Sequence, residues 1–229
     1  MIITTKAEGF GTGSAETAET MPAHAAPSVP SVSTMPQIPE FDVQQGEARP
    51  LPNFTAISAS GALCLIEVTC QQQPSISFVG FSSTKGLNVE VDDDGVLTLG
   101  GAAARGSNLV IRIGVPTLES IELTGAQMVK IAKLSTQEFA VDMSGACQLE
   151  LSGKVKKLWL GISGASFVNA KELQSEVVVV ESCGASKADV HVVREICASA
   201  SGVSKISYSG KPSTVRKETS GLAIIKSKD

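Results

Sequence analysis

The chain has few of the residues on which metal and cofactor sites depend. Its 229 residues include two histidines and five cysteines, and the cysteines form no Cys-x-x-Cys pair. The cysteines are Cys64, Cys70, Cys147, Cys183 and Cys197. Because zinc sites are recognised by closely spaced Cys and His ligands, neither a metal site nor a cofactor is expected. We expect these cysteines to act as small apolar core residues, with a disulfide framework as the weaker alternative.

Long hydrophobic runs and strong net charge are also missing. No segment approaches 18 consecutive apolar residues, so no transmembrane segment is predicted. Residues 1–6 show no basic region followed by a hydrophobic run, so no signal peptide is expected from them. The formal net charge of −4 gives no basis for nucleic-acid binding.

Aromatic residues and helical patterns are scarce as well. Aromatics make up 4% of the chain, whereas glycine contributes 21 of its 229 residues. No window shows a sustained 3.6-residue apolar period, so we expect few helices. The composition fits a narrow core filled by Val, Ile, Leu and Ala.

The C-terminal half does contain a repeat, in which Ser, Thr or Cys precedes a glycine and a small or aliphatic residue follows it. The repeat glycines are 20, 19, 20, 18 and 19 residues apart, a period typical of solenoids. They are Gly125, Gly145, Gly164, Gly184, Gly202 and Gly221.

Each repeat also shows the alternation of a strand with one buried face. The fourth residue after each glycine is apolar and the fifth is polar in all six repeats. The apolar column is Val129, Leu149, Val168, Ala188, Ile206 and Ile225. Alternation returns before the glycine, so each repeat has at least two strands. A unit of about 19 residues is too short to add a helix and instead predicts one coil of an all-β solenoid, stacked about 4.8 Å from the next. The glycine would turn a corner, with positive φ or close approach to the neighbouring coil.

The N-terminal part has a different composition. Residues 20–39 carry five prolines and no periodicity, so residues 1–48 are interpreted as a flexible segment with a Pro-rich linker. The alternative is an arm that packs along the solenoid, which would occupy residues 49–229. A further repeat occurs at Gly61, 64 residues before Gly125. The interval between these two glycines leaves room for about three less regular coils. Within them, Asp92–Gly95 predicts a hairpin turn, because the ligand pattern of an EF-hand calcium loop is missing.

Two outward columns are candidate sites. Three residues before the glycines stand Glu122, Asp142, Gly161, Glu181, Ser199 and Glu218. Glu122 and Asp142 would lie one coil apart, about 5 Å, and polysaccharide-cleaving β-helices place acidic groups on such a face. A solvated acidic stripe is the preferred interpretation, because no cluster of aromatic or basic residues accompanies these carboxylates.

The second column lies five residues before the glycines and contains the single tryptophan. Its members are Ser120, Ala140, Trp159, Val179, Cys197 and Arg216. Alternation places Leu158 and Leu160 inside, so Trp159 would point outward with Val179 and Cys197 as an apolar interaction strip. The alternative is that the linker or a loop covers it.

These repeats and the sequences around them resemble the bacterial putative auto-transporter adhesin, head GIN domain family. The resemblance covers residues 49–229 and rests on Arg49–Ile57, Val115–Ile121, the ordered Ser-Gly-Ala series, Tyr208–Pro212 and Ser220–Gly221. It implies a right-handed parallel β-helix, usually exported and often lipid-anchored in Gram-negative bacteria, with no established activity or catalytic residues. The chain departs from the family at Ile66 and Glu67, which interrupt the alternation after Gly61, in its Pro-rich segment and in lacking an export signal.

The resemblance favours a non-enzymatic, extracytoplasmic β-solenoid. Such a protein would act in the periplasm or at the cell surface as an adhesin-like or scaffold module. Its expected partner is a protein or glycan at the cell envelope, or a second copy of the chain. The alternative is a carbohydrate-active enzyme that uses the outward carboxylates.

Overall fold

The computed structural model describes residues 47–62, 65–80, 86–101 and 109–228. All described residues belong to one compact unit, Gln37–Asp229. The expected linker in residues 1–46 and the expected core residue Cys64 lie outside the described residues. The described part contains strands, turns and loops but no helix, which confirms the all-β expectation.

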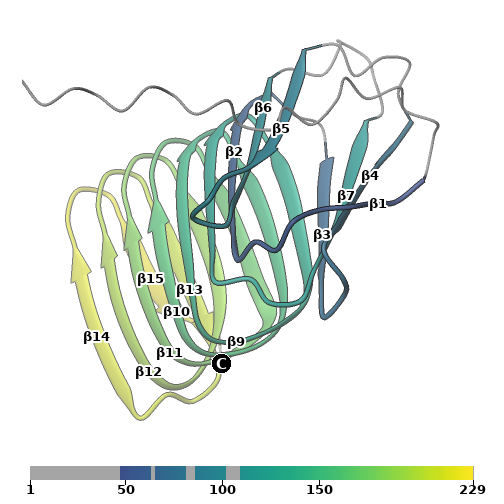
Figure 1. The fold of residues 1–229 in the computed structure, drawn as a ribbon. Helices are drawn as coiled ribbons and strands as arrows, with labels where there is room; N and C mark the ends of the chain where they lie inside the picture. Colours follow the sequence, from purple (N-terminus) through teal and green to yellow (C-terminus); the bar gives the residue numbers. More distant parts are fainter. Residues whose placement is uncertain (1–46, 63–64, 81–85, 102–108, 229) are drawn as a thin grey trace, which may run out of the picture. The chain divides into compact units, whose positions relative to one another are not determined.

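The strands join into one 15-stranded sheet that winds into stacked coils (Figure 1). In chain order they are β1 (Arg49–Pro50), β2 (Ala56–Gly61), β3 (Leu65–Cys70), β4 (Ser75–Val79), β5 (Leu87–Val91), β6 (Val96–Gly101), β7 (Val110–Val115), β8 (Ser120–Gly125), β9 (Met128–Gly145), β10 (Gln148–Ile162), β11 (Phe167–Ser182), β12 (Lys187–Ala200), β13 (Lys205–Ser209), β14 (Thr214–Thr219) and β15 (Ile224–Ser227).

The repeats form parallel coils in the predicted register. Strands β9, β10, β11 and β12 pair in parallel, and Leu149 lies opposite Val129 on one side and Val168 on the other. The column continues through Ala188 and Ile206 to the last coil. Its first five members are fully buried, whereas Ile225 in the last coil is half-buried. Apolar burial is therefore continuous from coil to coil, and only the terminal coil leaves the column partly open.

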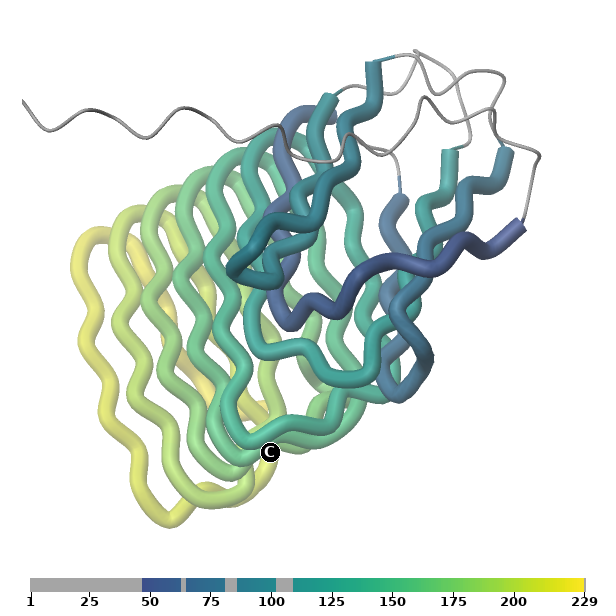
Figure 2. Tube along the Cα trace, in the orientation of Figure 1, coloured from purple at the N-terminus to yellow at the C-terminus, as the bar shows by residue number. Residues whose placement is uncertain are grey.

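The glycines form a stacked corner. At Gly164 φ is +79°, and a Cβ atom would lie 2.4 Å from the carbonyl oxygen of Gly145 in the preceding coil. The same close approach recurs from Gly125 to Gly221, with distances from 2.2 to 3.0 Å. Figure 2 shows these corners lying beside one another along the stack. The repeat therefore exists because glycine alone fits both the backbone conformation and the coil spacing.

The first coil keeps the same corner with one extra residue. Gly61 lies opposite Gly125, and β2 and β3 pair in parallel with β8 and β9. Ile66 nevertheless lies opposite Val129, five residues after its glycine instead of four. One additional residue at the corner therefore explains why the alternation appears to break at Ile66.

The expectation of about three less regular N-terminal coils is wrong. β6 and β7 pair in parallel with β2 and β3 on the side away from β8 and β9, so the coil formed later in the chain lies outside the earlier one. The other strands are antiparallel additions: β5 pairs β6, β4 pairs β7, and β1 pairs β4. The expected hairpin at Asp92–Gly95 is confirmed, with the Val96 amide donating to Asp92 Oδ1 at 2.8 Å.

The last coil places a charge at an inward position. Lys217 lies opposite the buried Ala198, and its Nζ is 4.8 Å from the ring centre of Tyr208. An inward charge on a terminal strand disfavours the addition of another strand or coil.

Candidate functional site

The acidic column has the expected register and is open to solvent. Glu122 lies opposite Asp142, followed by Gly161 and Glu181 in the next two coils. Glu122, Asp142 and Glu181 are all exposed. A general acid in a glycosidase is normally sheltered from water, because burial raises the carboxyl pKa toward the working pH. This geometry fits a solvated acidic stripe better than a catalytic pair.

A second outward column brings the candidate binding residues together. Trp159 lies opposite Ala140 and Val179, and Val179 lies opposite Cys197. Trp159, Ala140 and Val179 are half-buried, whereas Cys197 is exposed. We call these four residues the Trp159 strip. It presents a continuous apolar line across four coils, less exposed than alternation alone predicts.

Gly161 explains why Trp159 is partly covered. A Cβ atom on Gly161 would lie 2.6 Å from Cη2 and 3.0 Å from Cζ3 of the Trp159 indole. The benzene edge of the indole therefore occupies the space that a side chain at position 161 would fill. Gly161 is thus part of the same arrangement as Trp159, although sequence analysis assigned the two residues to separate columns.

Charged side chains border the Trp159 strip on both sides. Asp142 and Glu181 lie opposite Gly161, on the coils before and after it, so the indole edge sits between two carboxylate positions. On the other side, Lys157 Nζ lies 3.9 Å from Glu138 Oε1, and Glu195 lies 4.0 Å from Arg216, the residue that follows Cys197 in the column. An apolar centre with a polar rim is the usual composition of a partner surface.

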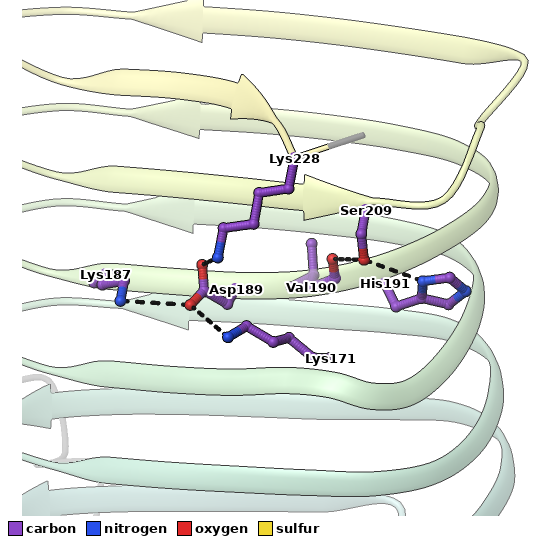
Figure 3. A network of polar contacts seen from close by, with 7 residues as sticks. All are labelled: Lys171, Lys187, Asp189, Val190, His191, Ser209 and Lys228. Atoms are coloured by element: carbon purple, nitrogen blue, oxygen red, sulfur yellow. Dashed lines mark hydrogen bonds and ion pairs between the residues drawn. The ribbon is translucent and has the colours of Figure 1, made fainter.

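A buried carboxylate, Asp189, lies on a third outward column, five residues after the repeat glycines. Sequence analysis did not identify it as a candidate site. The Asp189 side chain is 1% exposed and is held by three lysines, with Lys228 Nζ at 2.6 Å, Lys187 Nζ at 3.4 Å and Lys171 Nζ at 3.6 Å (Figure 3). Burial alone would raise the pKa of Asp189. The hydrogen bond from Lys228 and the charges of the three lysines outweigh burial and hold that pKa below its usual value.

This cluster connects distant parts of the chain. Lys228 follows β15, whereas Asp189 belongs to β12, and the Lys228 amide also donates to the Tyr208 carbonyl at 2.9 Å. The lysine stems cover a carboxylate that alternation places on the outside. The cluster therefore fixes the last coil, and its four members carry structural rather than catalytic chemistry.

A buried polar ladder was also missed. The second residue after each corner glycine is buried in five coils: Gln127, Cys147, Ser166, Ser186 and Ser204. Ser166 Oγ donates to the Gly145 carbonyl of the preceding coil at 3.2 Å. The sequence signal is a polar or thiol side chain recurring two residues after the glycine. These residues satisfy the corner carbonyls and stabilise the stack.

The cysteines divide into two groups. Cys70 and Cys147 are buried, as expected for core residues, and burial raises the pKa of the Cys70 thiol to about 11. Cys183 and Cys197 are exposed, so the expectation of an apolar core residue is wrong for Cys183, whereas the exposure of Cys197 agrees with its expected place in the outward strip. All four are free thiols.

The described residues include neither a cluster suited to a metal ion nor a helix suited to a membrane span. No group of three or more His, Cys, Asp or Glu side chains within these ranges could hold a metal ion. In the same part of the chain, no helix has the length and apolarity needed to cross a membrane. The arrangement found here consists of apolar and charged outer surfaces on a stacked sheet.

The sequence was compared with protein families. The family described as putative auto-transporter adhesin, head GIN domain, matches residues 53–212, which include the stacked corners up to Gly202 and the Trp159 strip. The chain belongs to this family. The earlier resemblance is thereby confirmed over most of its range. No match is found among curated proteins.

A solved structure shows the same fold as this head GIN domain protein. A crystal structure of a putative adhesin from Bacteroides fragilis is 19% identical, with a TM-score of 0.62, and the match covers 79% of this chain and 95% of that one. A putative adhesin from Parabacteroides merdae is 14% identical, with a TM-score of 0.44, and the match covers 80% and 95%. The Bacteroides fragilis match, at 19% identity, establishes the fold alone, and the function must be argued from the surface.

Proposed function

We propose that this head GIN domain protein is a non-enzymatic, extracytoplasmic interaction module that binds its partner through the Trp159 strip. The observation that carries the proposal is the seating of the Trp159 indole over Gly161. The ring is held in one place by its own strand, yet the residue is only half-buried. A large aromatic side chain that is fixed and still accessible is well suited to anchor a partner.

The surroundings of the indole support the same function. Asp142 and Glu181 provide hydrogen-bond acceptors beside it, while Ala140 and Val179 extend the apolar surface across neighbouring coils. This combination suits a glycan, which offers hydroxyl groups and apolar ring faces, or a protein surface with a complementary apolar patch. A second copy of the chain is the third candidate partner.

Family membership supports the location and the adhesin-like role. The family and the structural relatives carry adhesin descriptions, and adhesins act at the cell surface. We therefore place the protein in the periplasm or at the cell surface, as an adhesin-like or scaffold component of the cell envelope.

The proposal is tested by measuring binding and self-association in parallel. A glycan array probed with wild type and Trp159→Ala identifies carbohydrate partners, and sedimentation over a concentration series identifies self-association. Trp159→Ala should weaken self-association, or binding of an uncharged glycan, by about 30-fold or more, equivalent to about 2 kcal/mol. Leu222→Ala, which truncates an exposed side chain at the last corner, is the matched control and should bind like wild type.

Two outcomes would overturn this proposal. Equal binding by wild type and Trp159→Ala would remove the Trp159 strip from recognition. A monomeric wild type with blue-shifted Trp159 emission would show that the chain itself covers the strip.

A carbohydrate-active enzyme remains the second candidate, because Glu122 and Asp142 are direct register neighbours on adjacent strands. Two carboxylates one coil apart are close enough to act on the same glycosidic bond. If wild type releases reducing ends from a polysaccharide that it binds on the glycan array, this candidate would be favoured. Binding without release would favour the interaction module.

A further inference from the structure

The second corner of the coils, opposite the glycine corner, contains an open recess of about 380 Å³. Its lining includes Lys154 from β10, Gln174 from β11, Arg194 from β12, and Lys211 and Ser213 from the loop after β13. Four consecutive levels of the stack therefore contribute polar side chains. We call this feature the corner recess.

The corner recess forms because adjacent coils have unequal corners. From Ala170 to Gln174 strand β11 advances four residues, while the paired positions Val190 and His191 in β12 are consecutive. Further along, β12 has the longer path: it advances three residues from Val192 to Glu195, while the paired positions Ser175 and Val177 of β11 are two residues apart. The corner of β11 is longer, and the additional residue of β12 makes a bulge at Val193–Arg194 beside it.

Contacts to the backbone bring the residues that carry two of the cationic groups, Arg194 and Lys211, close together. Gly210 has φ of +90°, and a Cβ atom there would lie 2.1 Å from the Val192 carbonyl oxygen, so the loop carrying Lys211 passes directly against the bulge. The Ser213 hydroxyl donates to the Arg194 carbonyl at 3.1 Å. Arg194 and Lys211 are therefore brought to one place by the fold before any ligand binds, which lowers the entropic cost of binding.

The charge of the corner recess is positive although the whole chain carries −4. Three cationic side chains face one carboxylate, Glu176, giving a formal charge of +2. Glu176 lies 3.7 Å from Arg194, whereas Lys154 and Lys211 form no ion pair with another described residue. A concave cluster of one charge sign attracts the opposite ion more strongly than scattered surface charges do.

We propose that the corner recess binds a sulfate or carboxylate substituent of an acidic polysaccharide. The guanidinium of Arg194 can donate two parallel hydrogen bonds to such a group, and Lys154 and Lys211 add charge. The Gln174 amide and the Ser213 hydroxyl can contact neighbouring sugar hydroxyls. The volume lies near the lower end of the range of small-ligand sites, about 300–1,000 Å³, which suits one or two sugar units.

Several features favour a polysaccharide over an anionic membrane. Membrane attachment by charge needs about four to eight clustered basic residues, commonly with apolar side chains that insert between lipids. The corner recess has three basic residues, and Val193 is the single large apolar residue in its lining. A flexible chain can place a charged substituent inside a concavity, whereas a flat lipid surface meets its rim.

The site is separate from the Trp159 strip and extends the proposed function to a second contact. Lys154 and Trp159 lie five residues apart on β10, a distance of roughly 16 Å along a strand. A polysaccharide of several units could reach both, but the corner recess has its own charge and donors. Its binding therefore does not depend on the indole.

The experiment measures binding of fluorescent dextran sulfate and alginate, with neutral dextran and phosphatidylglycerol vesicles as comparison probes. Wild type should bind a sulfated or carboxylated polymer but not neutral dextran, with affinity that falls as salt rises. Lys154→Gln/Lys211→Gln should weaken this binding at least tenfold. The matched control Lys130→Gln/Lys226→Gln removes the same charge at exposed positions elsewhere and should stay within twofold, as should Trp159→Ala.

Four results would overturn the proposal: no binding of either acidic polymer, equal loss in the matched control, loss in Trp159→Ala comparable to that in the recess variant, or stronger recess-dependent binding to vesicles than to polymers. The recess lysines are exposed, so the variants should unfold at the wild-type temperature. A fifth contradicting result is loss in Trp159→Ala with retention in the recess variant, which would support the Trp159 strip and reject the corner recess.

Discussion

Replacement of a single corner glycine should have a large and calculable effect on stability. In Gly164→Ala, the new Cβ atom would lie 2.4 Å from the Gly145 carbonyl oxygen, at a φ of +79°. The left-handed conformation costs a residue with a side chain roughly 1–2 kcal/mol. Relief of the contact requires separation of two stacked coils, and overpacking of this kind costs about 1–3 kcal/mol. The expected loss in the free energy of unfolding is therefore about 2–5 kcal/mol.

Two further alanine variants calibrate this expectation. At Gly221, in the last coil, the Cβ atom would lie 3.0 Å from the nearest carbonyl oxygen, so Gly221→Ala should show mainly the conformational cost of roughly 1–2 kcal/mol. At Gly100 the nearest atoms would be 3.7 Å away and φ lies outside the left-handed region. Gly100→Ala should change stability by no more than about 1 kcal/mol in either direction.

Urea unfolding followed by far-UV circular dichroism and by Trp159 fluorescence measures these differences. Two probes are needed because a stacked repeat can lose its coils in more than one step. The reasoning is refuted if Gly164→Ala is as stable as Gly100→Ala to within about 0.5 kcal/mol. A loss at Gly221 larger than that at Gly164 would also contradict it.

Three other outcomes follow from the described side chains. Glu122→Gln/Asp142→Asn should leave folding and partner binding unchanged, and loss of a measured polysaccharide hydrolysis in this variant would instead favour an enzyme. Because the pKa of Asp189 is held below its usual value, its ionised form should stabilise the fold above about pH 4, and that contribution should disappear as pH falls through the lowered pKa. Asp189→Asn should therefore lower the melting temperature at pH 7 and flatten its acid dependence, and an unchanged acid profile would contradict this. In iodoacetamide labelling at pH 8, read by peptide mass spectrometry, Cys197 should react in the native protein and Cys70 only after unfolding; equal native labelling would show that the core opens.

The repeat architecture could be predicted from the sequence because every coil has to bury the same apolar positions and form the same glycine corner. Burial of Leu149 and Val168 in register follows from an apolar position recurring at a fixed distance from a glycine. The glycine itself is required by contact with the coil before it. Such columns are encoded locally, in about 19 residues, and therefore appear in the sequence without knowledge of the fold.

The N-terminal coil order was not readable for the opposite reason. β6 and β7 lie outside β2 and β3, and counting the residues before Gly125 gives no information about which edge of a coil accepts the next strand. The antiparallel strands β4 and β5 use residues that the count assigned to a further coil. Non-local pairing of this kind depends on which edges are already occupied.

Alternation correctly predicted which side chains point away from the coil interior, but it did not predict how exposed those side chains are. Alternation placed Trp159 and Asp189 outside the coil, and both are. Their burial depends on neighbours from other positions: Gly161 makes room for the indole, and three lysine stems cover the carboxylate. A column pattern gives the face of a side chain, whereas its exposure depends on what the adjacent columns contain.

The most direct test of the central claim is a glycan-array titration of wild type, Trp159→Ala and Gly161→Ala. Gly161→Ala retains the indole but fills the space in which its edge sits, so it displaces the anchor without removing it. The interaction-module account predicts that wild type binds without cleaving its ligand, that Trp159→Ala binds about 30-fold more weakly or worse, and that Gly161→Ala is also weakened. Undiminished binding by both variants, or cleavage of the bound glycan by wild type, would contradict the account.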